Sequence, residues 1–208
     1  MENADTSRIE SLLRYLSKPL DYSDPQIAII LAAGHGKRIK SETPKMLHQI
    51  WGVSTVLRVS QAATEGLSSP NQILVLGIKA EEVAEDSGTA KNRTFVYQEE
   101  QKGTGHAVGI ALDAIEQQDY EGTVYVFPGD VGLLNAGVVS EFKQSFDQSE
   151  SDMMVLTSTF HGPAEENYYG RILRIPDQDI EGNSSGEDAG KVLEIKEHKD
   201  ILGMSADE

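Results

Sequence analysis

The chain of 208 residues contains no cysteine, one tryptophan and few aromatic residues, which make up 6% of the composition. Without cysteine there is neither a disulfide framework nor a thiolate that could serve as a metal ligand or nucleophile. The longest apolar runs have the length of a strand, far below the roughly 20 residues of a membrane-spanning helix. The first residues are polar and acidic, unlike a signal peptide. The sequence therefore predicts a cytoplasmic protein without a membrane partner.

Positive charge is also scarce. The chain has 18 Lys and Arg residues against 34 Asp and Glu residues, a formal net charge of −16. Such a surface repels nucleic acid and anionic membranes, so we do not expect a protein that binds phosphate backbones. Four of the cations nevertheless gather in the segment LAAGHGKRIKSETPK, residues 31–45, which holds one acid. This local excess of positive charge indicates a binding site for an anionic ligand.

Apolar periodicity predicts an α/β domain, residues 25–208, behind a short N-terminal appendage, residues 1–24. In the appendage, residues 7–17 have the spacing of an amphipathic helix that packs on the domain or on a partner. Strands are expected at 27–33, 72–77, 94–98, 123–127 and 152–160, and helices at 53–66, 80–86, 105–117 and 137–146, with Thr104 as an N-cap. Strands that alternate with helices predict a mainly parallel sheet with right-handed crossovers.

The C-terminal part of the sequence has a different pattern. Residues 170–175 and 191–197 read as the two strands of a hairpin. Between them lies a polar, acidic and glycine-rich stretch, residues 176–190, which is typical of a mobile loop.

Glycine loops and one carboxylate follow the strands of the predicted sheet. Gly34 and Gly36 come after the first strand, Gln98 and the Gly103 loop after the third, and Gly129-Asp130 after the fourth. The carboxyl ends of parallel strands share one edge, where ligands bind. Because glycine loops let backbone N–H groups approach an anion, we interpret this edge as a polyphosphate site. The alternative is a tight turn followed by solvated lysines.

Asp130 is a candidate metal ligand. It follows an apolar strand and a glycine, and Mg²⁺ takes one or two protein carboxylates together with phosphate oxygens. The alternative is a structural aspartate in a turn or at a helix N-terminus.

Other well-known binding and catalytic motifs do not fit the sequence. The dinucleotide fingerprint needs a third glycine where Ile39 stands, and the P-loop needs a glycine in place of Leu31. Residues 182–186 match G-x-S-x-G, but they lie in an acidic loop without the preceding strand and following helix of a nucleophile elbow. The five histidines lack the spacing of metal ligands and are interpreted as packing or surface residues.

Five segments together resemble the sugar-nucleotide pyrophosphorylases, above all the uridylyltransferase domain of the bacterial N-acetylglucosamine-1-phosphate uridylyltransferases. They are LAAGHGKRIKSETPK (31–45), QEEQKGTGHA (98–107), GDV (129–131), YYGRI (168–172) and EIKEHKD (194–200). The order is that of the family, and the resemblance spans residues 26–202. Lys37 and Ile39 are mild departures, and Gly132-Leu133 stands where the family has Pro-Leu.

The resemblance implies a Rossmann-like, mostly parallel sheet flanked by helices, of the nucleotide-diphospho-sugar transferase type. It also implies Mg²⁺-dependent uridylyl transfer from UTP to N-acetylglucosamine 1-phosphate, with Arg38 on the triphosphate, Lys45 at the reacting phosphate and Asp130 on Mg²⁺. The implied substrate-binding residues are Leu31, Ala32, Ala33, Gly34, Gly36, Gln98, Gly103, Thr104, Pro128 and Gly129 for the nucleotide and Gly170 and Glu197 for the hexosamine. A homo-oligomer is left open.

Several alternatives remain at this stage. Another sugar phosphate, or cytidylyl transfer on the same fold, would use similar loops, and a domain that binds nucleotide sugars without catalysis is a rival of another class. The family's domain also continues past the matched region with two further asparagines at the site. No asparagine follows Asn183 here, so the domain is expected to be incomplete at its C-terminus.

Overall fold

The computed structural model describes residues 2–34, 41, 43–116, 118–163 and 166–201, which divide into two units, residues 1–154 and 155–208. In the first unit, α1 (Glu2–Leu16) precedes β1 (Gln26–Ala32), and η1 (Lys45–Leu47) leads into the short strands β2 (Gln49–Ile50) and β3 (Val53–Ser54). The unit continues with α2 (Thr55–Leu67), β4 (Gln72–Leu76), α3 (Ala80–Ser87), β5 (Arg93–Tyr97), α4 (Thr104–Glu116), β6 (Thr123–Pro128) and α5 (Ala136–Asp147). These elements confirm the predicted alternation of strands and helices.

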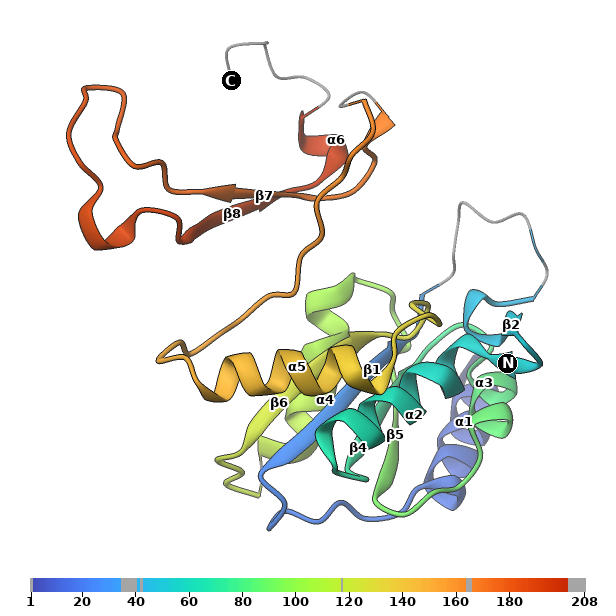
Figure 1. Ribbon diagram of the computed structural model, residues 1–208. Helices are drawn as coiled ribbons and strands as arrows, with labels where there is room; N and C mark the ends of the chain where they lie inside the picture. The colour runs from blue at the N-terminus through green and yellow to red at the C-terminus, as the bar shows by residue number, and fades with distance from the viewer. Residues whose placement is uncertain (1, 35–40, 42, 117, 164–165, 202–208) are drawn as a thin grey trace. The chain divides into compact units, whose positions relative to one another are not determined.

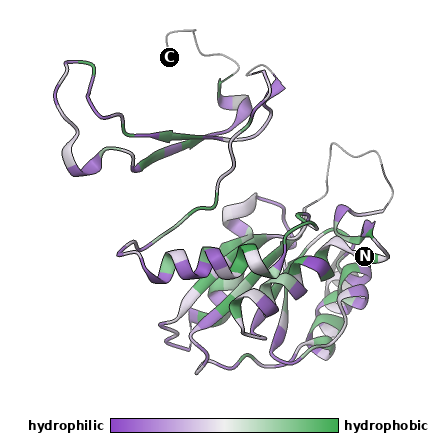
Figure 2. Cartoon of the chain, in the orientation of Figure 1, coloured by the Kyte–Doolittle hydropathy of each residue, from purple (hydrophilic) through white to green (hydrophobic). Residues whose placement is uncertain are grey.

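The first unit is built on a parallel sheet of four strands in the order β5-β4-β1-β6 (Figure 1). β1 lies in its interior, and its alternate side chains enter two separate cores. Ala28 and Ile30 pack in the core beneath α2, whereas Ile27 and Ile29 pack in the core that includes Ala111 of α4. Figure 2 shows the same concentration of apolar residues along the strands. A continuous apolar run is what a strand covered on both faces requires, so this prediction is confirmed.

The N-terminal helix packs on its own domain. Leu13 is buried against β5 and α3, and Arg8 Nε lies 3.1 Å from Glu81 Oε1. Beyond the helix, the Lys18 amide donates to Arg93 O at 2.7 Å and the Phe95 amide donates to Ser17 Oγ at 3.0 Å. These contacts cover the outer edge of β5, which would otherwise present unpaired backbone groups.

A buried guanidinium holds the amino-terminal end of the sheet. Arg93 donates to Ser87 O at 2.5 Å, to Ser60 Oγ at 2.6 Å and to Gln72 Oε1 at 3.2 Å. Burial lowers the pKa of this arginine, because the charged form is removed from water. The neutral acceptors come from α2, α3 and β4, so one side chain ties two helices to two strands.

The expected strand at residues 152–160 is wrong. The structure shows no strand there, and Met153 and Leu156 are 79% and 60% exposed. The residue types favour an extended chain, but a strand is stable only when another strand pairs with it. These residues span the boundary between the two units, and none of the described strands pairs with them.

The second unit contains the predicted hairpin. β7 (Arg171–Arg174) pairs antiparallel with β8 (Val192–Lys196), and the connection includes a one-turn 3₁₀ helix, η3 (Gly186–Asp188). Hydrogen bonds from the backbone and side chain of Asn183 to the Asp179 carboxylate organise this connection and lower the pKa of Asp179. A final helical turn, α6, spans His198–Ile201.

We predict that Leu13→Ala lowers the free energy of unfolding by about 2–4 kcal/mol, because it leaves a cavity between α1 and β5. Urea unfolding followed by circular dichroism measures the change. Tyr15→Ala is the matched control on the same helix: Tyr15 is 80% exposed, and its loss should cost less than about 0.5 kcal/mol. Equal stability of the two variants would show that α1 does not dock in solution.

Candidate active site

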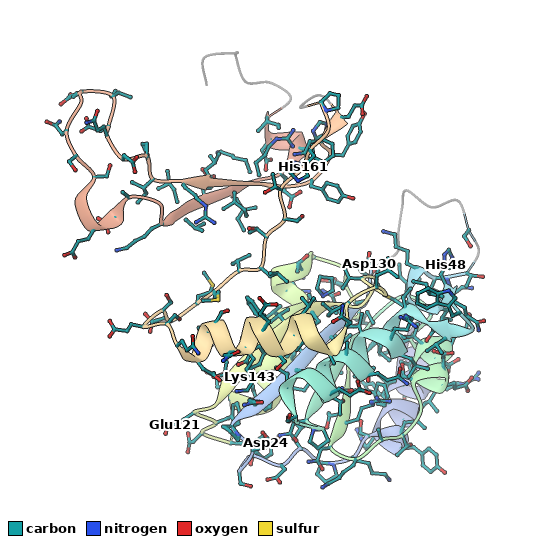
Figure 3. All side chains as sticks on the ribbon, viewed as in Figure 1. Asp24, His48, Glu121, Asp130, Lys143 and His161 are labelled. Carbon is teal, nitrogen blue, oxygen red and sulfur yellow. The ribbon has the colours of Figure 1, made fainter. Side chains whose placement is uncertain are left out.

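The end of β1 lies beside the end of β6, as the sequence predicted for neighbouring carboxyl ends. Leu31 pairs with Pro128, and the Gly129 amide donates to Leu31 O at 2.9 Å, one residue beyond β6. A Cβ on Gly129 would lie 2.9 Å from Leu31 O and 3.1 Å from Met46 Sδ. Only glycine allows this approach, and Asp130 follows directly. Figure 3 shows Asp130 at the end of the unit opposite Asp24 and Glu121.

Lys45 and Asp130 meet at this edge although 85 residues separate them. Lys45 Nζ lies 3.5 Å from Asp130 Oδ2, with side chains 27% and 39% exposed. The ammonium belongs to η1, and the carboxylate belongs to the turn after β6. A cation and a carboxylate at one strand edge, both open to solvent, can each approach a phosphate group or its counterion.

The loop after β5 forms a second part of the site. The backbone amide of Gln98 donates to Leu76 O at 2.7 Å, and the residue is 3% exposed. Gln98 Nε2 donates to Gly103 O at 3.3 Å and lies 3.0 Å from His106 Nδ1. Gly103 has a φ of 106°, which favours glycine, and Thr104 begins α4 rather than capping it. The predicted base-reading residues Gln98, Gly103 and Thr104 are therefore brought together.

Two residues that sequence reasoning passed over belong to this arrangement. A Cβ on Gly77 would lie 2.8 Å from Ala33 O and 2.9 Å from Gln101 Nε2, so a glycine after β4 lets the loops after β1 and β5 meet. The sequence signal was a glycine at the end of a buried strand. His106, which is interpreted from the sequence as a packing or surface residue, packs with its ring against the Gln98 side-chain amide.

Charge in the loop after β5 is partly paired. Lys102 forms an ion pair with Glu100, and its hydrogen bond, together with its charge, lowers the pKa of that exposed carboxyl. An acid that stays ionised and paired does not repel a triphosphate as strongly as a free one.

The remaining predicted residues fall into three groups. Ala32 and Ala33 are buried at the end of β1, and Gly34 is exposed just beyond them. Gly36 and Arg38 lie outside the described residues. Gly170 and Glu197 come together within the second unit, where a Cβ on Gly170 would lie 3.7 Å from Glu197 Oε1.

Asp130 suits a metal ion that is also bound by phosphate oxygens of a ligand better than a metal ion held by protein side chains alone. Within the described parts of the chain, no group of three or more His, Cys, Asp or Glu side chains could hold an ion. A single solvent-accessible carboxylate suits Mg²⁺, which keeps waters and phosphate oxygens among its ligands.

Comparison with known proteins supplies the family. Residues 28–181 match the model of the MobA-like NTP transferase domain. The chain belongs to this family. The matched residues include the segment that follows β1, Lys45, the loop after β5 that contains Gln98, and Asp130. The match confirms the fold class inferred from the sequence. None of its described helices is long and apolar enough to cross a membrane.

Curated relatives are named bifunctional protein GlmU. The one from Mycolicibacterium gilvum is 40% identical over 166 residues, which cover 77% of this chain and 32% of the relative. The one from Streptomyces griseus is 37% identical over 180 residues, which cover 86% and 34%. This NTP transferase thus spans about a third of the length of these relatives. A nucleotidyl transferase structure from Methanothermobacter thermautotroptrophicus is similar with a TM-score of 0.48 and 19% identity, covering 58% and 57% of the two chains.

We predict that Gly129→Ala destabilises the protein by about 1–3 kcal/mol, because the new methyl group meets a backbone oxygen of β1. Gly109→Ala is the control. Gly109 lies in α4, an added Cβ there has nothing within 4 Å, and alanine should stabilise the helix by up to about 1 kcal/mol. Urea unfolding distinguishes the two. Equal stability of Gly129→Ala and the parent would contradict the tight β1–β6 junction.

Proposed function

We propose that this chain transfers a uridylyl group from UTP to N-acetylglucosamine 1-phosphate, in the cytoplasm, and releases pyrophosphate in a Mg²⁺-dependent reaction. The observation that carries the proposal is the meeting of Lys45 and Asp130, 3.5 Å apart, at the carboxyl edge of the sheet. Membership in the NTP transferase family supports the reaction class, and the order of the five sequence motifs supports the substrates.

The proposed reaction needs positioned charge more than a base. A phosphate oxygen of the sugar 1-phosphate attacks the α-phosphorus of UTP, a new P–O bond forms, and the bond to the β-phosphate oxygen breaks. The second pKa of a phosphate monoester is about 6, so the nucleophile is already ionised at neutral pH. Lys45 would stabilise negative charge that develops at the transferred phosphoryl group. A catalytic Ser-His-Asp arrangement is therefore unnecessary.

Other residues would bind and orient the substrates in this proposal. The backbone of residues 31–34 and Gly36 would hold the nucleotide, Arg38 would bind the triphosphate, and Gln98, Gly103 and Thr104 would read the uracil. Pro128 and Gly129 would lie beside the nucleotide. Gly170 and Glu197 would contact the hexosamine. All of these residues belong to the proposed nucleotidyltransferase domain, residues 25–208. Mg²⁺ bound with Asp130 would offset the charge of the phosphate oxygens.

A ligand panel tests the proposal directly. We expect the thermal midpoint to rise with UTP and with UDP-N-acetylglucosamine, because a ligand that binds only the native state stabilises it by mass action. CTP and ATP serve as controls, each with and without Mg²⁺. A preference for CTP or ATP would contradict the proposed base. UDP-N-acetylglucosamine binding that is independent of Mg²⁺, without pyrophosphate release, would favour a non-catalytic domain.

We further predict that Lys45→Ala lowers the rate of pyrophosphate release by about 10²-fold, the effect of losing one preorganised charge. Asp130→Ala should abolish the Mg²⁺-dependent rate. The pair Lys143 Nζ–Asp147 Oδ2 on α5 is a matched control, 2.5 Å apart and 24% and 47% exposed, and its alanine variants should keep the parental rate. Retained turnover in Asp130→Ala would remove this carboxylate from the mechanism.

A further inference from the structure

The first turn of α2 contacts the segment that carries Lys45. Thr55 Oγ1 donates to Lys45 O at 3.0 Å and lies 3.1 Å from Met46 O. Thr55 is 6% exposed, so these hydrogen bonds are shielded from water. Because η1 is a single turn of 3₁₀ helix, an external donor to its carbonyl groups restricts where the Lys45 backbone can lie.

The same helix turn contacts the segment that carries Asp130. Arg58 Nε donates to Gly132 O at 2.6 Å, two residues beyond Asp130. A Cβ on Gly132 would lie 2.8 Å from Thr55 Cγ2 and 2.9 Å from Ile50 Cδ1. Glycine at this position, where the family resemblance would place proline, thus lets the turn after β6 lie directly against α2.

The indole ring of Trp51 contacts the Arg58 side chain. The guanidinium carbon lies 4.9 Å from the centre of the indole ring, within range of a cation–π interaction. Trp51 and Gly52 form the two-residue turn between β2 and β3, with φ angles of 52° and 81°. A tryptophan rarely adopts this left-handed conformation, and Trp51 is 82% exposed, so burial does not account for the conformation. The role that we infer for the exposed ring is this contact with the Arg58 guanidinium.

We propose that Thr55 and Arg58, which lie on one rigid turn of α2, are positioning residues that set the distance between Lys45 and Asp130. Thr55 acts through the carbonyl groups of η1, and Arg58 acts through the Gly132 carbonyl. This inference rests on the proposed function, in which Lys45 and Asp130 act on the same phosphate groups. A displacement of either group by about 1 Å would weaken both metal-nucleotide binding and turnover.

Paired substitutions isolate the two hydrogen bonds. Arg58→Gln keeps an N–H donor at the place of Nε and removes the charge, whereas Arg58→Met has the same length as the glutamine variant and removes both the donor and the charge. Thr55→Ser keeps the hydroxyl, whereas Thr55→Val keeps the shape and removes it. Equal thermal midpoints within each pair establish that the fold is intact.

The measurement is Mn²⁺ affinity in the presence of UTP, from the free-ion electron paramagnetic resonance signal, with UTP affinity without metal measured by calorimetry. We expect Arg58→Met to weaken Mn²⁺ binding by about tenfold or more, as the loss of an outer hydrogen-bond partner does, with metal-free UTP binding unchanged. Thr55→Val should weaken UTP binding with and without metal. The Gln and Ser variants should stay near the parent.

The outcomes separate this inference from the function on which it rests. A parent chain that binds UTP and Mn²⁺ together, while Arg58→Met and Thr55→Val bind as tightly, would overturn the positioning role alone. Equal losses in Arg58→Gln and Arg58→Met would overturn it too, because the charge and not the hydrogen bond would then matter. A parent chain that binds neither ligand would overturn the proposed function and this inference with it.

Discussion

The parallel pairing of β1 with β6 is the constraint on which the rest of the candidate site depends. Both strands run in the same direction, so the segments that follow them emerge at one edge. The pairing continues one residue beyond β6 through the hydrogen bond from the Gly129 amide to Leu31 O, and this places Asp130 opposite the end of β1. Burial of β1 on both faces makes this register costly to shift, because a slip would exchange its two sets of core side chains.

The electrostatic arrangement suits binding better than stability. An exposed ion pair contributes only about 0–1 kcal/mol, and the 3.5 Å separation of Lys45 and Asp130 is long even for such a pair. Lysine carries a point charge on a flexible side chain. Its ammonium group can therefore leave a carboxylate and bind a phosphate, because neither contact requires a fixed orientation. In a chain with a net charge of −16, a local cation of this kind also determines where an anion can approach.

Patterns along the chain predicted most of the fold, because the helices and parallel strands of the first unit have strong periodicity and glycine or serine at their ends. The prediction failed at residues 152–160, where composition favours a strand but no described strand offers a partner edge. It also missed the hairpin of β2 and β3, since strands of two residues have no readable period. For the candidate site, sequence motifs single out Lys45, Gln98 and Asp130, whereas Gly77, Thr55 and Arg58 belong to none of these motifs and are recognised through their contacts.

The sequence by itself determined the class of fold, the family, and which residue types stand at the carboxyl ends of the strands, because these follow from local spacing and from motifs a few residues long. Tertiary structure decided which of those residues meet. Lys45 and Asp130 are far apart in the chain and become neighbours only through the order of strands in the sheet. Likewise, α1 could have packed on a partner by its sequence, and the open edge of β5 decided that it packs on its own domain. Such pairings depend on packing across the sheet, which no local pattern encodes.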